Sequence, residues 1–234
     1  MKTNVRKILA IGAHPDDLEI SCAGSLAKWA KEGSLITMVV VSNGELSSPD
    51  AALSGKMGKI RGEEFINSAA IIKARKLRLN MEDGLIFDDK SSRLVFIKLI
   101  KEVRPDIVIT HYPKDDHPDH RAVNSLVCSS IVIAQAESPD PNWRVKKVYF
   151  MDSLGSINFY PDTYIDISET VSIKKQMLLS HLSQFKVMKK KYKIDLWDVV
   201  EATARFRGIQ ANVKYAEAFV EFRSWRRSGV INEP

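Results

Sequence analysis

Short apolar runs recur along the chain and are separated by polar segments. Three of them are continuous, at Ile8 to Ile11, Leu35 to Val41 and Ile107 to Ile109, and the segments KKVYFM at 146–151 and TYIDI at 163–167 have a strand-like composition. Continuous apolar runs are typical of parallel β-strands that are covered on both faces, whereas a half-exposed strand alternates apolar and polar residues. These five segments are therefore predicted to be strands.

Helical patterns lie between the predicted strands. One apolar stripe contains Leu18, Cys22, Leu26 and Trp29, and a second runs from Val123 to Ala134. Apolar residues spaced in this way form one face of an amphipathic helix. Strands that alternate with helices predict an α/β fold, with a Rossmann-like, mostly parallel open sheet and helices on both faces. Because the 234 residues contain no repeat or linker, we expect a single domain over residues 1–234.

The amino-acid composition mainly excludes classes of protein, in particular those with a membrane span or a disulfide framework. The hydrophobic fraction is 44% and the charged fraction 27%, and no apolar run approaches the roughly 18 residues that span a bilayer. Ile8 to Ile11 is also too short for the core of a signal peptide. We therefore expect a cytoplasmic protein with no membrane partner. The only cysteines, Cys22 and Cys128, lie in helix-like apolar patterns, so buried thiols are expected rather than a disulfide.

The net charge of +6 favours an anionic partner, either an anionic substrate or a nucleic acid. The one dense basic run is KVMKKKYK at 186–193, and a run of this kind is usually the solvated face of a helix. Aromatic residues are not interleaved with the basic ones, which argues against a nucleic-acid partner. The segment ELSSPDAALSGKMGK at 45–59 is predicted to be a loop, either a mobile one at the mouth of an active site or an inert surface loop.

Two His-Pro-Asp segments carry the candidate chemistry. HPDD at 14–17 follows the first predicted strand, and DDHPDH at 115–120 follows the strand at 107–109. Ligands of open α/β sheets bind beyond the carboxyl ends of the strands, so both segments can face one crevice. Together with His111 they contain four of the five histidines. Such clustering favours a metal or catalytic site over isolated core histidines.

A catalytic zinc typically takes three protein ligands, such as two histidines and one carboxylate, and leaves one position for water. His14, Asp17 and His120 can supply this set, and the same donors also accept Fe²⁺ or Co²⁺. Asp16 is then left beside the attacking water and can act as its general base.

His117 lies three residues before His120 and is the second candidate catalytic group. It can protonate a leaving amine or stabilise an oxyanion, and Asp119 can orient it.

Three other interpretations compete with a zinc hydrolase. HPDD alone would be explained as well by a helix cap after a turn. A nucleotide-binding module is disfavoured because the turn GAHPDD lacks the G-x-G-x-x-G pattern and its carboxylates would repel a pyrophosphate. A catalytically idle protein that binds a small molecule or a partner protein is disfavoured because the proposed ligands and the base are all present.

These motifs resemble those of the LmbE/PIG-L family of zinc-dependent N-deacetylases. Residues 13–17 match its AHPDD motif and residues 117–120 its HPDH motif, and weaker matches are Arg61 and Glu64 in R-x-x-E and residues 180–184 in H-x-S-Q. RGIQANVKYAEAF at 207–219 resembles the end of the branch that contains bacillithiol-biosynthesis deacetylases. The chain departs from the family pattern at Leu18, where Glu is common, and at Ala23, where Gly is usual.

The resemblance implies an enzyme that removes the acetyl group from a small N-acetylglucosamine-containing molecule and, as in several members, a homo-oligomer. It implies the following roles: zinc ligands His14, Asp17 and His120; base Asp16; electrostatic or acid catalyst His117, held by Asp119; and a contact to substrate hydroxyls from Arg61. The family also uses a Tyr near the oxyanion, for which Tyr112 and Tyr160 are equal candidates. His181, in a helix-like stretch, is expected to be structural.

Overall fold

The computed structural model describes residues 5–47 and 55–223. Its strands are β1 (Lys7–Gly12), β2 (Leu35–Ser42), β3 (Arg75–Met81), β4 (Ile107–His111), β5 (Lys147–Met151), β6 (Thr163–Asp166) and β7 (Ala216–Glu221). Its helices are α1 (Asp17–Ser21), α2 (Ala23–Lys31), the 3₁₀-helix η1 (Glu45–Ser47), α3 (Met57–Ile71), α4 (Lys90–Val103), α5 (Pro118–Ala136), α6 (Val171–Leu179), α7 (Leu182–Tyr192) and α8 (Leu196–Gln210).

All seven strands belong to one sheet, in the order β3-β2-β1-β4-β5-β7-β6. The pairs from β3 to β5 are parallel, and β7 runs antiparallel to both of its neighbours. The prediction of a mostly parallel open α/β sheet is thus confirmed, as are the five predicted strands. Two strands were not predicted: β3 (RKLRLNM) is a partly exposed edge strand rich in basic residues, and β7 (AEAFVE) contains two glutamates.

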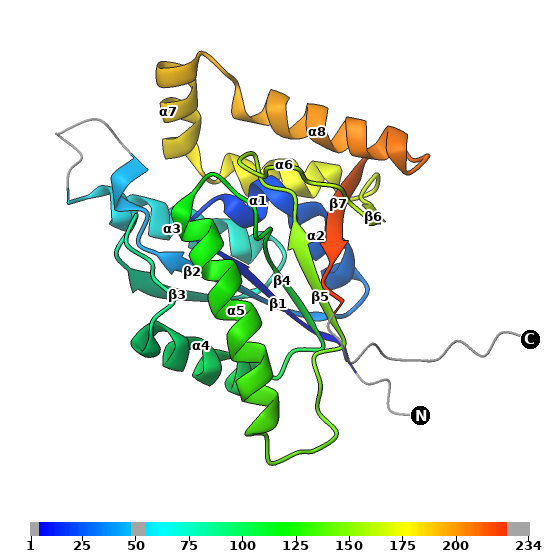
Figure 1. Cartoon of the computed structure of the whole chain (residues 1–234). Coiled ribbons are helices and arrows are strands. Elements are labelled where there is room, and N and C mark those ends of the chain that lie inside the picture. The colour runs from blue at the N-terminus through cyan, green and yellow to red at the C-terminus, as the bar shows by residue number, and fades with distance from the viewer. Residues whose placement is uncertain (1–4, 48–54, 224–234) are drawn as a thin grey trace, which may run out of the picture.

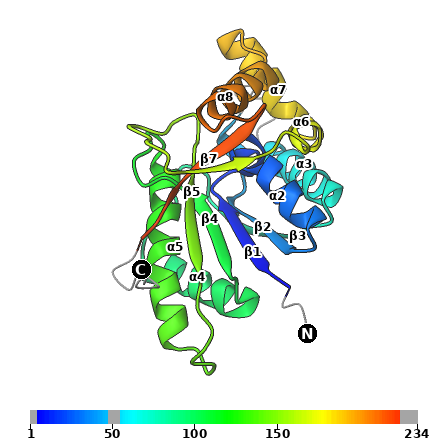
Figure 2. The same cartoon turned by 90° about the vertical axis from the view of Figure 1, so that its right-hand side faces the viewer.

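Helices cover both faces of the sheet, which explains why the strands read as continuous apolar runs. Figure 2 shows α4 and α5 on one face and α2, α3 and α6 on the other. Along β1, Leu9 and Ile11 pack into the first of these layers, whereas Ile8 and Ala10 pack into the second, and all four are fully buried. The two faces of one strand therefore belong to two hydrophobic layers.

The first predicted helical stripe is interrupted in the structure. Helix α1 ends at Ser21 and α2 begins at Ala23, because Cys22 has φ −143° and leaves the helical conformation. Both cysteines are free; Cys22 is buried as expected, whereas Cys128 is only partly buried. No helix of the described residues is long and apolar enough to cross a membrane. Of the predicted loop at 45–59, residues 48–54 lie outside the described residues, and the remainder includes η1 and the start of α3.

The direction in which strands are added to the sheet reverses between β1 and β4. These two strands pair in parallel, and their successors along the chain, β2 and β5, lie on opposite sides of them. Loops after such strands diverge and leave a crevice at their carboxyl ends. HPDD follows β1 and DDHPDH follows β4, and these two strands are parallel neighbours (Figure 1), so both candidate segments begin at the same end of the sheet.

A buried ion pair joins the unpredicted strand β7 to the rest of the fold. Glu217 accepts hydrogen bonds from the backbone N–H groups of Gly24 and Ser25 at 2.9 and 2.7 Å, and Lys174 Nζ lies 2.6 Å from its carboxylate. Lys174 also donates to the carbonyl of Ile20 at 2.7 Å. Because both charged side chains are almost fully buried, Glu217 is tolerated in a strand interior only through these partners.

Candidate functional site

Donor atoms of three residues from the two His-Pro-Asp segments lie close together at this end of the strands. Nδ1 of His14 lies 3.3 Å from Nε2 of His120 and 3.6 Å from Oδ2 of Asp17, and Nε2 of His120 lies 3.5 Å from Oδ1 of Asp17. A tetrahedral metal site with bonds of about 2.0–2.2 Å has donor atoms about 3.3–3.6 Å apart. The two nitrogens have the spacing of a tetrahedral site, and each has one oxygen of the Asp17 carboxylate at a similar distance, Oδ2 for His14 and Oδ1 for His120.

Carboxylates hold His14 from the side opposite to these donors. Nε2 of His14 lies 3.1 Å from Oδ2 of Asp119 and 3.0 Å from Oδ1 of Asp83. Asp119 is itself fixed, since it accepts hydrogen bonds from the backbone N–H groups of Gly84 at 2.8 Å and Ile86 at 3.2 Å. A carboxylate behind a metal-ligating histidine sets the ring orientation and leaves the other nitrogen free for the metal. Asp83, in the loop after β3, has no motif around it and was not predicted.

His120 has the same kind of support. Its Nδ1 lies 3.1 Å from Oδ2 of Asp115, and the Ser153 hydroxyl donates to that same oxygen. Oδ1 of Asp115 accepts the backbone N–H of His117 at 2.9 Å. Asp115 thus holds the ring so that Nε2 faces His14 and Asp17. It precedes HPDH by two residues, and its position in DDHPDH was the only sequence signal for this role.

The electrostatics of this cluster suit a divalent cation. Five carboxylates (Asp16, Asp17, Asp83, Asp115 and Asp119) are buried around the histidines, each no more than 9% exposed. Burial alone would lower the pKa of His120, but the carboxylates of Asp17 and Asp115 raise it to about 9. Burial alone would also lower the pKa of His14, but the carboxylates of Asp119, Asp17 and Asp83 raise this pKa well above its usual value. A buried site that attracts protons so strongly also attracts a metal ion, and the metal would displace those protons.

Asp16 is buried beside the three donors and bears strain in its backbone. Its φ of 112° is unusual for a residue with a side chain, and such conformations cost roughly 1–3 kcal/mol. Burial, with a smaller opposing effect from Arg61, raises the pKa of its carboxyl to about 6. A carboxylate with a pKa close to neutrality is well matched to a general base.

Arg61 holds Asp16 in this position. Its Nη2 donates to Oδ1 of Asp16 at 2.9 Å and to the carbonyl of Pro15, and its Nη1 donates to the carbonyl of Gly44 at 3.1 Å. The close approach requires Gly44, which has φ 70° and where a Cβ atom would lie 2.9 Å from Nη1. Arg61 was predicted to contact substrate hydroxyls. The structure places it 3% exposed and turned to the HPDD loop, because its guanidinium balances the buried carboxylate of Asp16.

His117 caps helix α5 and lines the same cluster. Its Nδ1 accepts the backbone N–H of Asp119 at 3.2 Å, so in the neutral ring the proton is on Nε2. The ring centroid lies 4.6 Å from that of His14 and 4.8 Å from that of His120. Burial and these two histidines lower the pKa of His117, which favours the neutral form as an N–H donor. Asp119 was expected to orient His117, and it contacts this ring through its backbone N–H while its carboxylate contacts His14.

The remaining sequence candidates have structural contacts. His111 Nε2 accepts the backbone N–H of Ala13 at 2.9 Å and ties β4 to the loop after β1, a role that its place at a strand end did not reveal. His181 is fully buried, with Nε2 3.3 Å from Glu19, in agreement with the structural interpretation. Tyr112 packs against aromatic rings and its hydroxyl donates to a backbone carbonyl at 3.4 Å, and Tyr160 is 79% exposed.

The R-x-x-E and H-x-S-Q segments also meet in the structure. Glu64 accepts hydrogen bonds from the backbone N–H of Ser183 at 2.8 Å and from its hydroxyl at 2.6 Å. This contact fastens α7 to α3, the helix that carries Arg61.

Comparison with known proteins identifies the family. Residues 9–131, more than half of the chain, match the family model described as PIG-L: GlcNAc-PI de-N-acetylase. The chain is 27% identical to the diacetylchitobiose deacetylase of Thermococcus kodakarensis, over 92% of this chain and 82% of that protein. It is 26% identical to a probable N-acetyl-alpha-D-glucosaminyl L-malate deacetylase 2 of Bacillus anthracis, over 85% of this chain and 92% of that protein.

One similar solved structure shows that the fold is not confined to deacetylases. The 4-carboxy-2-hydroxymuconate hydratase of Pseudomonas putida has a TM-score of 0.81 and 24% identity, covering 97% of this chain and all of that one. At this identity the likeness concerns the fold alone, whereas the family match rests on the segment that contains both His-Pro-Asp motifs. The chain belongs to the PIG-L family and is an N-deacetylase.

Proposed function

We propose that the chain is a zinc-dependent deacetylase that hydrolyses the acetamide of a small N-acetylglucosamine-containing molecule, releasing acetate and a primary amine. The observation that carries the proposal is that each of the two histidine rings has one nitrogen against a carboxylate and the other nitrogen turned toward the second histidine. These other two nitrogens have the spacing of a tetrahedral site, and each has an oxygen of Asp17 at a similar distance. Rings fixed in this way are typical of metal sites rather than of helix caps.

A zinc ion held by His14, Asp17 and His120 would supply Lewis acidity to the acetyl carbonyl and lower the pKa of the attacking water. Asp16 takes the proton of that water, for which its raised pKa and its fixed contact to Arg61 prepare it. Nε2–H of His117 donates to the oxygen of the tetrahedral intermediate as negative charge develops there. A protonated group then helps to expel the sugar amine.

Arg61 acts in this scheme as a positioning residue. It compensates the charge of Asp16 and fixes the strained turn through the carbonyl of Pro15. A guanidinium matches a carboxylate in geometry and stays charged at all working pH values, so Lys would not replace it fully.

The alternatives make different demands on the same residues. A nucleotide-binding module would not need two histidines held by carboxylates, and anionic phosphates would be repelled by five buried carboxylates. An idle sugar-binding homologue would have no use for a strained base, since strain of this kind persists at functional sites. Addition of water to a carbon–carbon double bond, as in the hydratase, would release no acetate.

The test is acetate release from a panel of N-acetylglucosaminides by zinc-loaded protein, run beside protein stripped with a chelator and beside stripped protein to which zinc has been restored. We expect release only with metal and at least one productive substrate. Full activity in the stripped protein would refute metal dependence, and failure of fully zinc-loaded protein to release acetate from any member would favour the idle homologue.

A further inference from the structure

Helix α7 carries a basic surface that contributes no residue to the candidate site. The stretch from 182 to 193 contains five lysines and no acidic residue, and the nearest acidic residues along the chain are Glu169 and Asp195. All five lysines are exposed, namely Lys186, Lys189, Lys190, Lys191 and Lys193. The dense basic run of the sequence is therefore an exposed helix whose charge is not balanced within its own segment.

The inner side of α7 attaches the helix to the rest of the protein. Gln184 is buried and donates to the hydroxyl of Ser47 at 3.1 Å, and Ser183 is held by Glu64. Phe185 and Met188 pack against a small core that α7 shares with α6 and α8. These contacts fix the orientation of α7 on the body of the protein.

The outer side of α7 carries the charge. Lys186 precedes Lys189 by three residues and Lys190 by four, so the three side chains lie on one face of the helix. Leu182 precedes Lys186 by one turn on the same face and is 57% exposed. Figures 1 and 2 both show α7 at the upper end of the molecule. A face formed in this way is open to a large partner.

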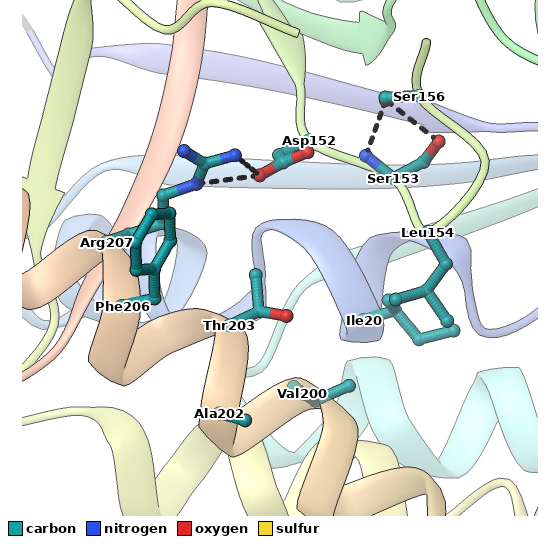
Figure 3. A pocket seen from close by; sticks show the side chains of 10 residues that line it. All are labelled: Ile20, Asp152, Ser153, Leu154, Ser156, Val200, Ala202, Thr203, Phe206 and Arg207. Carbon is teal, nitrogen blue, oxygen red and sulfur yellow. Dashed lines mark hydrogen bonds and ion pairs between the residues drawn. The ribbon is translucent and has the colours of Figure 1, made fainter. Parts of the chain in front are cut away.

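Ion pairs within the protein do not neutralise this face. None of the ion pairs between the described residues includes any of the five lysines. The neighbouring helix α8 differs, because Arg205 lies 3.0 Å from Glu201 and Arg207 lies 2.7 Å from Asp152, as Figure 3 shows for the second pair. The cations of α7 are thus available to an external anion.

The helix dipole explains only part of the basic run. Lysines in the last turn of a helix stabilise it, and Lys189, Lys190 and Lys191 lie in that turn of α7. Lys186 lies before that turn, where the dipole has little effect. Lys193 follows the helix, with its Nζ 3.3 Å from the carbonyl of Lys190. A helix of this length does not need so many cations for its own stability.

Exposed apolar side chains border the lysines at both ends of the helix. Leu179 and Leu182 lie at its start, and Tyr192 and Ile194 lie at its end, between 38% and 57% exposed. At the surface of a bilayer, lysines meet the phosphate headgroups while neighbouring apolar side chains enter the boundary with the acyl chains. Tyrosine is enriched at the same depth. The combination of residues on α7 matches this layered partner.

Other anionic partners match the same surface less well. A nucleic acid offers phosphates but no apolar layer for Leu182 or Ile194. A second copy of the chain carries the same net charge of +6, so two α7 surfaces would repel each other. A small soluble anion requires an enclosed site, and the pocket of about 460 Å³ drawn in Figure 3 is lined by α1, the loop after β5 and α8.

We propose that α7 docks the protein on the surface of a bilayer that contains anionic lipids. The headgroups are a docking surface and not a substrate, because α7 supplies none of the candidate catalytic or metal-binding residues. The proposal runs against the expectation of no membrane partner, which rested on the lack of a segment long enough to span a bilayer. Docking through lysines and a few apolar side chains needs no such segment.

The first test removes the charge of the outer face. The triple variant Lys186→Gln, Lys189→Gln, Lys190→Gln keeps residues of similar helix propensity. The matched control is Lys31→Gln, Lys76→Gln, Lys98→Gln, which removes the same charge from three exposed lysines on α2, β3 and α4. Binding of the full chain is measured by co-sedimentation with vesicles of phosphatidylcholine alone and of equal parts phosphatidylcholine and phosphatidylglycerol.

We expect wild type to bind the anionic vesicles and not the neutral ones, and to be released as salt rises from about 0.1 M to about 0.5 M. A lysine near an anionic membrane contributes about five-fold to affinity, so the α7 variant should bind about one-hundred-fold more weakly. The control should bind like wild type. Thermal unfolding and release of acetate from a soluble N-acetylglucosaminide should be the same in all three proteins, because the substitutions lie outside the candidate site.

The second test separates a bilayer from other polyanions. Leu182→Gln removes one exposed apolar side chain and no charge. We expect it to weaken binding to anionic vesicles about ten-fold and to leave retention on heparin unchanged. Failure of wild type to bind anionic vesicles, or an equal loss of affinity in the control and the α7 variant, would overturn the proposal. Equal vesicle binding by wild type and Leu182→Gln would assign the surface to a polyanion without an apolar layer. These are binding measurements, so they do not depend on the proposed deacetylase activity.

Discussion

Asp115→Asn tests whether the carboxylate behind His120 positions this ring for a metal. The substitution preserves side-chain volume and removes the charge from a residue that is 2% exposed. The carboxylate bonds His120 Nδ1 at 3.1 Å, and hydrogen bonds to charged groups contribute about 1.5–3 kcal/mol. Since about 1.4 kcal/mol corresponds to a factor of ten, we expect zinc to bind about 10- to 100-fold more weakly.

The assay is competition for zinc between the protein and a chromogenic chelator, with thermal unfolding of the zinc-free proteins recorded in parallel. Asp116→Asn is the matched control. Asp116 is the exposed neighbour of Asp115, so the same substitution there changes a carboxylate outside the cluster. We expect the control to bind zinc like wild type. A folded Asp115→Asn protein with wild-type zinc affinity would refute the idea that this carboxylate fixes the ligand.

Three further predictions address the base, the metal and the fold. Asp16→Asn should retain zinc but lower kcat about 10²–10⁴-fold, and wild-type acetate release in this variant would remove Asp16 as the base. Zinc at about one hundred times its Kd should raise the free energy of unfolding by about 2.7 kcal/mol, measured by urea denaturation with and without chelator, and an unchanged midpoint would argue against a structured metal site. Glu217→Gln should lower that free energy by about 3–5 kcal/mol because Lys174 would stay buried and unpaired. Adding Lys174→Met should recover much of the loss, and a double variant no more stable than Glu217→Gln would contradict this reason.

Sequence patterns predicted the central part of the fold because its strands are covered on both faces. Ile8 to Ile11 and Ile107 to Ile109 are continuous apolar runs, and they became β1 and β4. Strands β3 and β7 were not predicted because they contain polar residues. These residues are tolerated either because they face solvent or because they contact a partner of opposite charge. Half of β3 faces solvent at a sheet edge, and Glu217 in β7 is balanced by Lys174, which is distant in sequence.

The candidate site divides in the same way. The proximity of His14, Asp17 and His120 could be predicted because each motif is local in sequence and follows a strand at the switch in strand order. Asp83 and Asp115 could not be assigned roles, since their contacts to the histidines depend on how the loops after β3 and β4 fold over the crevice. The contact of Arg61 with Asp16 was not predicted, because the two residues lie 45 positions apart in the chain.

The carboxylates behind the two histidines connect several loops of the protein. Ser153 donates to Asp115, so a change in the loop after β5 acts on His120. Asp83 and Asp119 likewise connect the segment after β3 to His14. Loops of α/β folds normally vary freely to alter specificity, but here two of them also position His14 and His120. Substitutions that are meant to alter specificity should therefore leave Asp83 and Ser153 unchanged, because a change at Asp83 acts on His14 and a change at Ser153 acts through Asp115 on His120.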